Sequence, residues 1–221
     1  MYPLHHYRLF PPYPVEERVF VAMDFSEKFD RRWETVICPA IESVEINGRK
    51  LKAHRVDTSR IIVSVVSEIL DGIGRELLVF ADITTLHVID GRALRNVNVL
   101  YELGIAHAVR LPEENIIFRS DTDVLPFDVA NIRVNFYRPE ENPAEAREMV
   151  SNSIVTALQS LDEQRRTAVD LAAESLDPNT AVTLMLLAAN HPPATRPAVP
   201  KTPLGDHAAH YARTRPYERL L

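Results

Sequence analysis

The chain has one cysteine, no long apolar run and no basic block, and each absence excludes a class of protein. The single cysteine, Cys38, cannot build an internal disulfide framework or a cysteine-based zinc site, and it suits a reducing compartment. No apolar stretch approaches the ~18 residues of a membrane-spanning helix. The 25 basic and 31 acidic residues give a mildly acidic chain, which argues against a nucleic-acid backbone as partner. We therefore expect a soluble, cytoplasmic protein.

Common phosphate-binding and metal-binding motifs are also missing. No GxGxxG follows the first predicted strand and no Walker loop occurs, which excludes the ordinary dinucleotide and NTPase phosphate sites. The histidines near the two ends, His5, His6, His207 and His210, have no partners at metal-ligand spacing. The sequence predicts neither a metal nor a cofactor.

Five short apolar segments have the length of buried strands. The clearest is Glu76 to Asp82, which is apolar without alternation, as in parallel strands covered on both faces. The others are at 18–23, 51–56, 115–119 and 132–136. Helical periodicity separates several of them: one helix is expected at about 27–46, bent at Pro39, and another begins at Thr58 or Ser59 and runs to about Ile73. This alternation predicts an α/β fold with a doubly wound, five-stranded parallel sheet of flavodoxin-like order 2-1-3-4-5.

The pattern changes on both sides of this sheet domain, which is expected at 18–138. Residues 1–17 form an N-terminal arm rich in Pro, Tyr and His. Asn142-Pro143-Ala144-Glu145 is a capping box that opens a helix to about Glu174, and Asp177-Pro178 starts a shorter one to about Ala189. We expect a helical extension over 139–190 and a Pro-rich tail over 191–221, and we expect a homodimer or larger homo-oligomer.

One helix start carries an unusual carboxylate. The stretch RNVNVLYELGIAHA, from Arg95 to Ala108, begins a helix for which Asn96 or Asn98 is a suitable N-cap. At about 100° per residue, Glu102 falls between Ala106 and Val109 on an otherwise apolar face. Solubility does not explain a carboxylate there, so a functional role is indicated.

The topology is expected to bring further polar residues to the same place. Ligands bind such sheets at the carboxyl ends of the strands, where the strand order reverses between strands 1 and 3. Strand 1 ends at Asp24-Phe25, strand 3 ends at Asp82-Ile83-Thr84, and a loop of about a dozen residues, 83–95, leads to Glu102. Capping and turn formation explain each polar residue alone, but their convergence indicates a binding site with the following members: Asp24, Phe25, Asp82, Thr84, Asn96, Asn98 and Glu102.

The segments FVAMDF, FADIT, RNVNVLYELGIAHA, LPFD and IRVNFY, in this order, resemble the TIR-like nucleotide-binding proteins of bacteria. More distantly they resemble the nucleoside 2-deoxyribosyltransferases and deoxynucleotide N-glycohydrolases. The resemblance covers about residues 17–137, and the NVNVLYELGIAHA block carries most of it. The chain lacks the Gly- and aromatic-rich turn that follows strand 1 in the transferases and has Met23-Asp24-Phe25 instead.

The resemblance implies a flavodoxin-like fold and cleavage or exchange of an N-glycosidic bond. It implies that Glu102 is the nucleophile, that Asp82 holds the base or sugar, and that Asn96 and Asn98 lie at the nucleotide. Displacement at an anomeric carbon passes through an oxocarbenium-like state that a carboxylate can stabilise or capture. Two alternatives stay open, namely a nucleotide-binding sensor without turnover and an interaction module with a vestigial pocket.

Overall fold

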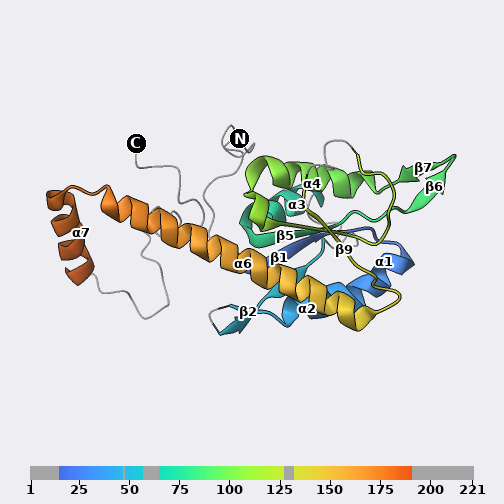
Figure 1. Cartoon of the computed structure of the whole chain (residues 1–221), viewed down its shortest axis with the longest axis horizontal. Coiled ribbons are helices and arrows are strands. Elements are labelled where there is room, and N and C mark those ends of the chain that lie inside the picture. Colours follow the sequence, from blue (N-terminus) through green and yellow to red (C-terminus); the bar gives the residue numbers. More distant parts are fainter. Residues whose placement is uncertain (1–14, 47, 57–64, 127–131, 191–221) are drawn as a thin grey trace. The chain divides into compact units, whose positions relative to one another are not determined.

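The computed structural model describes residues 15–46, 48–56, 65–126 and 132–190 (Figure 1). The Pro-rich tail, most of the N-terminal arm and the N-cap predicted at Thr58 or Ser59 lie outside these residues. Part of the LPFD segment, Phe127 and Asp128, also lies outside them.

The central element is a five-stranded sheet in which every strand pairs in parallel with its neighbours. The strands, in spatial order, are β4 (Lys52–His54), β1 (Glu16–Ala22), β5 (Glu76–Asp82), β8 (Asn115–Arg119) and β9 (Val134–Phe136). This order is the predicted 2-1-3-4-5, and the α/β class is confirmed. The strand order reverses between β1 and β5, which neighbour each other although β4 lies between them in sequence.

The first connection differs from the single bent helix that the sequence predicts. It consists of α1 (Glu27–Arg32), a π-helical turn (Trp33–Ile37) and α2 (Cys38–Glu42). Pro39 occupies the first turn of α2, where its missing N–H is tolerated, and the irregular turn lies before it rather than at it. The predicted helix also ends early, because Glu45–Ile46 forms β2, which pairs with β3 (Arg49–Lys50).

The loop predicted at 83–95 contains a β-hairpin. Strands β6 (His87–Ile89) and β7 (Arg92–Leu94) pair in antiparallel fashion around Asp90-Gly91. Both turn residues have positive φ, 50° and 72°, as the two central positions of a type I′ turn require. The Asp-Gly pair between two short segments is the sequence signal for this hairpin, which the prediction of a plain loop missed.

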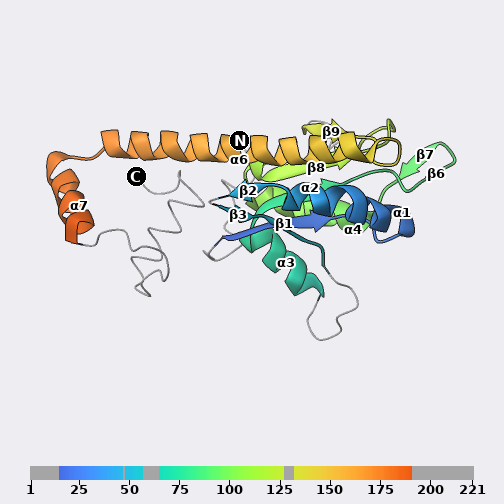
Figure 2. The ribbon, with the colours of Figure 1, turned by 90° about the horizontal axis from the view of Figure 1, so that it is seen from below.

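Helices cover both faces of the sheet (Figures 1 and 2). Helices α3 (Val65–Arg75) and α4 (Val97–Val109) lie on one face, where Phe20, Val79 and Ala81 pack in a core cluster with Leu103 and Ala106. On the other face, alternate strand residues meet α1, α2 and the first part of α6, and Phe118 stacks on Phe80 with ring centroids 5.3 Å apart. Successive strand residues therefore point to opposite layers.

The two predicted C-terminal helices are confirmed as α6 (Pro143–Glu174) and α7 (Pro178–Asn190). The Asn142 side chain accepts from the Glu145 backbone N–H at 3.2 Å and donates to the Glu145 carboxylate at 2.9 Å, which closes the predicted cap. The chain divides into two compact units within α6, after Leu158. No helix in the described ranges is long and apolar enough to cross a membrane. The role of α6 and α7 in assembly stays a prediction.

Two helical glycines provide a matched test of the packing. A Cβ at Gly72 would overlap the Phe20 ring, whereas a Cβ at Gly104 would meet nothing within 4 Å. We expect Gly72→Ala to destabilise the protein by about 1–3 kcal/mol through overpacking. We expect Gly104→Ala to stabilise it by up to about 1 kcal/mol through helix propensity. Urea unfolding of both variants measures this, and equal effects would contradict the packing described for α3.

Candidate functional site

The end of β1 and the start of α4 are joined by a direct side-chain contact. Asn96 Nδ2 donates to Asp24 Oδ2 at 2.7 Å, and Asn96 Oδ1 accepts from the backbone N–H groups of Asn98 and Val99. Asn96 is therefore the N-cap of α4, and Asn98 is exposed in its first turn. The structure brings together Asp24, Asn96 and Asn98, as the sequence predicts.

The Asp24 carboxylate is stabilised in its charged form. Burial opposes ionisation, but hydrogen bonds from Ser26 and Asn96 outweigh it and lower the pKa of Asp24. The charge of His87, at the start of β6, acts in the same direction, so the base of the hairpin lies close to this carboxylate. Asp24 is therefore an acceptor at neutral pH and not a proton donor.

Glu102 lies one and a half turns into α4 at the margin of its buried face. The residue is half-buried, and burial raises the pKa of its carboxyl to about 7. Within the described part of the chain it has no hydrogen-bond or ion-pair partner. Glu102 follows Asn96 by six positions, which is a rise of about 9 Å along the helix axis.

Asp82 is not brought to Glu102. Its neighbour Ile83 belongs to the core cluster that includes α4, and strand alternation therefore directs Asp82 to the opposite face of the sheet. There the carboxylate is fully buried and accepts from Arg32 Nη1 at 2.9 Å and from the Tyr137 hydroxyl at 2.6 Å. Its second oxygen accepts from the backbone N–H and the hydroxyl of Thr84. Both oxygens of Asp82 are therefore occupied by hydrogen bonds within the protein, so its role is structural.

The same cluster contains Thr84 and extends to two further elements. Arg32 Nη2 donates to Ser120 Oγ at 2.7 Å, after β8, and the guanidinium also binds both carboxylate oxygens of Glu140, which lies before α6. Burial opposes the Arg32 charge, but Asp82 and Glu140 outweigh it and raise the pKa of the guanidinium. Thr84 is 3 % exposed and bonded within this cluster, so it does not lie at the place predicted to contact a ligand.

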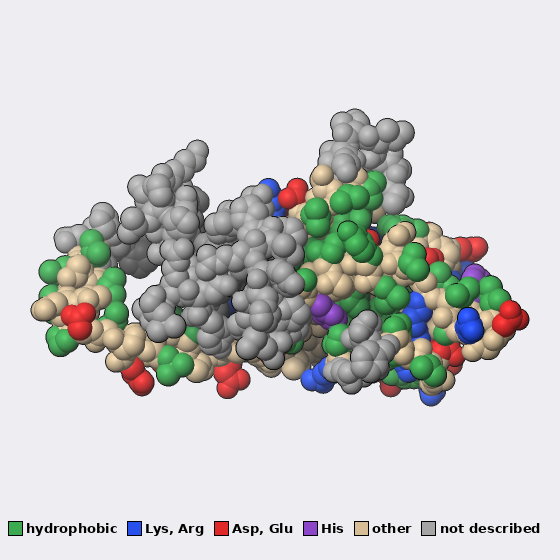
Figure 3. Space-filling view, turned by 90° about the horizontal axis from the view of Figure 1, so that it is seen from above, with side chains coloured by type: hydrophobic (Ala, Val, Ile, Leu, Met, Phe, Trp, Pro, Cys, Tyr) green, Lys and Arg blue, Asp and Glu red, His purple; other side chains and the backbone are tan. Residues whose placement is uncertain are grey.

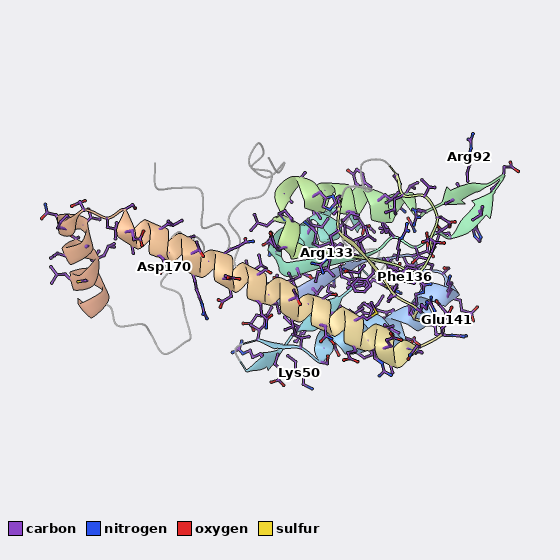
Figure 4. All side chains as sticks on the ribbon, in the orientation of Figure 1. Lys50, Arg92, Arg133, Phe136, Glu141 and Asp170 are labelled. Atoms are coloured by element: carbon purple, nitrogen blue, oxygen red, sulfur yellow. The ribbon has the colours of Figure 1, made fainter. Side chains whose placement is uncertain are left out.

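A second buried arginine fixes the base of the hairpin. Arg95 donates to both carboxylate oxygens of Asp121, at 2.9 and 3.1 Å, and to the carbonyl of Ile83. Asp121 also accepts from the Thr85 backbone N–H at 2.8 Å. The hairpin thus projects from a fixed base, and Arg92 extends from its far end away from the sheet (Figure 4).

Phe25, a predicted site residue, contacts Arg55, for which the sequence predicted no role. Phe25 is 44 % exposed, and the Arg55 guanidinium lies over its ring at 4.5 Å and over the Trp33 ring at 5.4 Å. Arg55 Nη2 donates to Asp30 at 2.6 Å. Arg55 directly follows β4 and so belongs to the carboxyl edge of the sheet. The predicted strand at 51–56 includes Arg55, and a charged residue near the carboxyl end of that segment is the signal that could have identified it.

The surface over α3 and α4 carries many hydrophobic side chains (Figure 3). At the start of α4, the side chains of Val97 and Tyr101 are exposed. In the described ranges no group of three His, Cys, Asp or Glu residues is placed to hold a metal ion. The chemistry available at this edge is that of two carboxyl groups, one amide cap and an aromatic-bound guanidinium.

Replacing Arg32 tests the buried cluster. Arg32→Met keeps much of the apolar volume but leaves Asp82 buried without its cation, so we expect a loss of about 3–5 kcal/mol in unfolding free energy. The neighbouring Arg31→Met changes a side chain that is 75 % exposed and should stay within about 0.5 kcal/mol of the parent. Adding Asp82→Asn to Arg32→Met should recover part of the loss, because the fully buried unpaired charge is then removed and Glu140 is partly exposed. An Arg32→Met variant with the same unfolding free energy as the parent would contradict a stabilising role of the buried cluster.

The raised pKa of Glu102 makes its contribution to stability depend on pH. A carboxyl whose folded pKa is about 7 and whose reference value is 4.5 stabilises the folded state only while protonated, and this is lost as pH rises from 4.5 through 7. Glu102→Gln should therefore exceed the parent in stability at pH 8 by roughly 1–2 kcal/mol, after discounting for partial exposure, and match it near pH 4. Thermal unfolding at both pH values measures this. A pH-independent difference would contradict the burial of Glu102.

No protein-family model matches this chain, and a search of curated proteins finds no significant relative.

Proposed function

We propose that this protein cleaves or transfers the N-glycosidic bond of a nucleoside, a nucleotide or a dinucleotide such as NAD. The observation that carries the proposal is the pair of carboxyl groups at one edge of the sheet. Hydrogen bonds lower the pKa of Asp24 and keep it ionised, whereas burial raises the pKa of Glu102 to about 7. Groups whose surroundings separate their pKa values in this way are typical of acid, base and nucleophile pairs. The resemblance of the RNVNVLYELGIAHA segment supports the same assignment.

In the proposed reaction Glu102 attacks the anomeric carbon. Its carboxylate oxygen forms an ester bond to that carbon while the carbon–nitrogen bond breaks, and the bonding electrons leave with the base nitrogen, which takes up a proton. Water then releases the sugar in a hydrolase, or a second base displaces Glu102 in a transferase. Both outcomes regenerate the free carboxylate.

Asp24 and Asn96 orient the sugar in this proposal. Asp24 is ionised and acts as an acceptor, which fits a sugar hydroxyl and not the departing base. Asn96 donates to Asp24 at 2.7 Å and caps the helix that carries Glu102, so it connects the two segments that bear the carboxyl groups. Asn98 remains a candidate ligand contact at the exposed helix start. Asp82 and Thr84 are positioning residues that hold the carboxyl edge of the sheet together.

Base release tests the proposal directly. Purified protein incubated with each common deoxynucleoside, its 5′-monophosphate and NAD should release free base, which chromatography detects. Glu102→Gln removes the nucleophile and should lower the rate at least about a hundredfold. Glu148→Gln, an exposed carboxylate on α6, is the matched control and should retain the parent rate. Base release by Glu102→Gln at the parent rate would exclude Glu102 as nucleophile.

The pH dependence of kcat/KM separates a nucleophilic role of Glu102 from an acidic one. Only the ionised carboxylate attacks, and its pKa in the free protein is about 7. The value of kcat/KM should therefore rise with pH through about 7 and level off above it. A profile that falls through the same region would assign Glu102 as a proton donor.

A nucleotide-binding sensor without turnover is the second candidate. One observation favours it: in the described ranges no acidic side chain is bonded to Glu102, and burial alone raises the pKa of its carboxyl to about 7. This candidate predicts a saturable rise in melting temperature with a nucleotide and no release of base. An interaction module with a vestigial pocket predicts neither.

A further inference from the structure

The buried side-chain nitrogens and oxygens at the carboxyl edge include one strong donor without a partner. Arg55 Nη1 is buried and has no hydrogen-bond acceptor, while Nη2 of the same group is bonded to Asp30. Among the described residues, Arg95 Nε and Arg110 Nε are also buried without a hydrogen-bond acceptor, and Arg110 Nε lies 3.5 Å from the Glu114 carboxylate. A terminal guanidinium nitrogen carries two N–H groups, whereas Nε carries one, so a buried Nη1 without an acceptor leaves more hydrogen-bond donors unsatisfied.

The surroundings hold the Arg55 guanidinium in one orientation. Phe25 and Trp33 lie against it at 4.5 and 5.4 Å, and Asp30 binds one edge of the fork. Aromatic contacts of this kind stabilise the cation and leave the edges of the planar group for hydrogen bonding. Nη1 is therefore a buried donor held in a fixed place without an acceptor, and the fork geometry of arginine matches the oxygens of a phosphate.

The position of Arg55 connects this donor to the proposed site. Strands β4 and β1 are neighbours, and Arg55 and Asp24 each follow the carboxyl end of one of them. Phe25, whose ring contacts the guanidinium, is the residue after Asp24. Phe25 therefore connects the Asp24 segment with the guanidinium.

We propose that Arg55 Nη1 binds a phosphoryl group of the ligand, so that the protein selects a nucleotide over the corresponding nucleoside. This inference rests on the proposed function for the location of the sugar, but it concerns binding and not turnover. The negative charge of the phosphoryl group complements the cation, and the Phe25 ring supports the adjoining part of the ligand.

Calorimetric titration tests the inference in the Glu102→Gln background, where turnover cannot consume the ligand. The probes are inorganic pyrophosphate and each common deoxynucleoside beside its 5′-monophosphate. We expect the monophosphate to bind at least about tenfold more tightly than its nucleoside, and Arg55→Gln to remove this preference. Arg31→Gln, an exposed arginine on the same helix as Asp30, should preserve it. Equal affinities in the parent, or a preference that survives Arg55→Gln, would overturn the inference.

A second variant acts in the opposite direction and separates ligand binding from folding. Asp30→Asn removes the negative charge beside Arg55 and should bind pyrophosphate as tightly as the parent or more tightly. Weaker pyrophosphate binding by a folded Asp30→Asn protein would overturn the assignment. Phosphate binding that depends on Arg55 but occurs without base release from the parent would refute the proposed reaction and leave this inference intact.

Discussion

The structure depends above all on one buried guanidinium. Arg32 donates five hydrogen bonds, to Asp82, Thr84, Ser120 and both oxygens of Glu140, and its group lies over the Phe29 and Tyr137 rings. The acceptors follow or end strands β5 and β8 and precede α6, so a single cation ties separate segments to one point. Such a cluster is stable only when each buried polar group is satisfied, because an unpaired charge in the interior is costly. Burial raises the pKa of Tyr137 well above its usual value, which keeps its hydroxyl protonated as a donor to Asp82.

This arrangement divides the carboxyl edge of the sheet between two tasks. On the face of α1 the polar groups saturate one another, and no acceptor of Asp82 is left for a ligand. On the face of α4 the carboxyl groups of Asp24 and Glu102 have fewer partners and more contact with solvent. Adjacent residues meet the two faces, Asp82 at the end of β5 and Ile83 directly after it, because side chains alternate along an extended chain. The fully hydrogen-bonded polar groups on one face give a rigid support, and the groups with fewer hydrogen bonds on the other face are left to bind a ligand.

Sequence patterns sufficed for the sheet order because segments of strand length alternate with connections that are long enough to cross over. They also offered Asn96 or Asn98 as the cap of α4, of which Asn96 is the cap, and they placed Glu102 on an otherwise apolar helix face. They failed for Asp82 and Thr84, because position at a strand end does not reveal which face a side chain meets. They missed Arg55, because its role arises from contacts with Phe25, Trp33 and Asp30, which are distant in sequence from it. The π-helical turn before Pro39 has no periodic signal, since it comprises a single turn.

The contrast between Asp24 and Glu102 bears most directly on function. Both carboxyl groups are partly withdrawn from water at the same edge, yet hydrogen bonds from Ser26 and Asn96 keep the first ionised, whereas burial alone acts on the second. A chain selected only for stability would have given Glu102 a partner or replaced it with an apolar residue, because a half-buried carboxyl without a partner destabilises the folded state at neutral pH. Its presence one and a half turns beyond the Asn96 cap is therefore best explained by a reaction or a ligand that uses the ionised carboxylate.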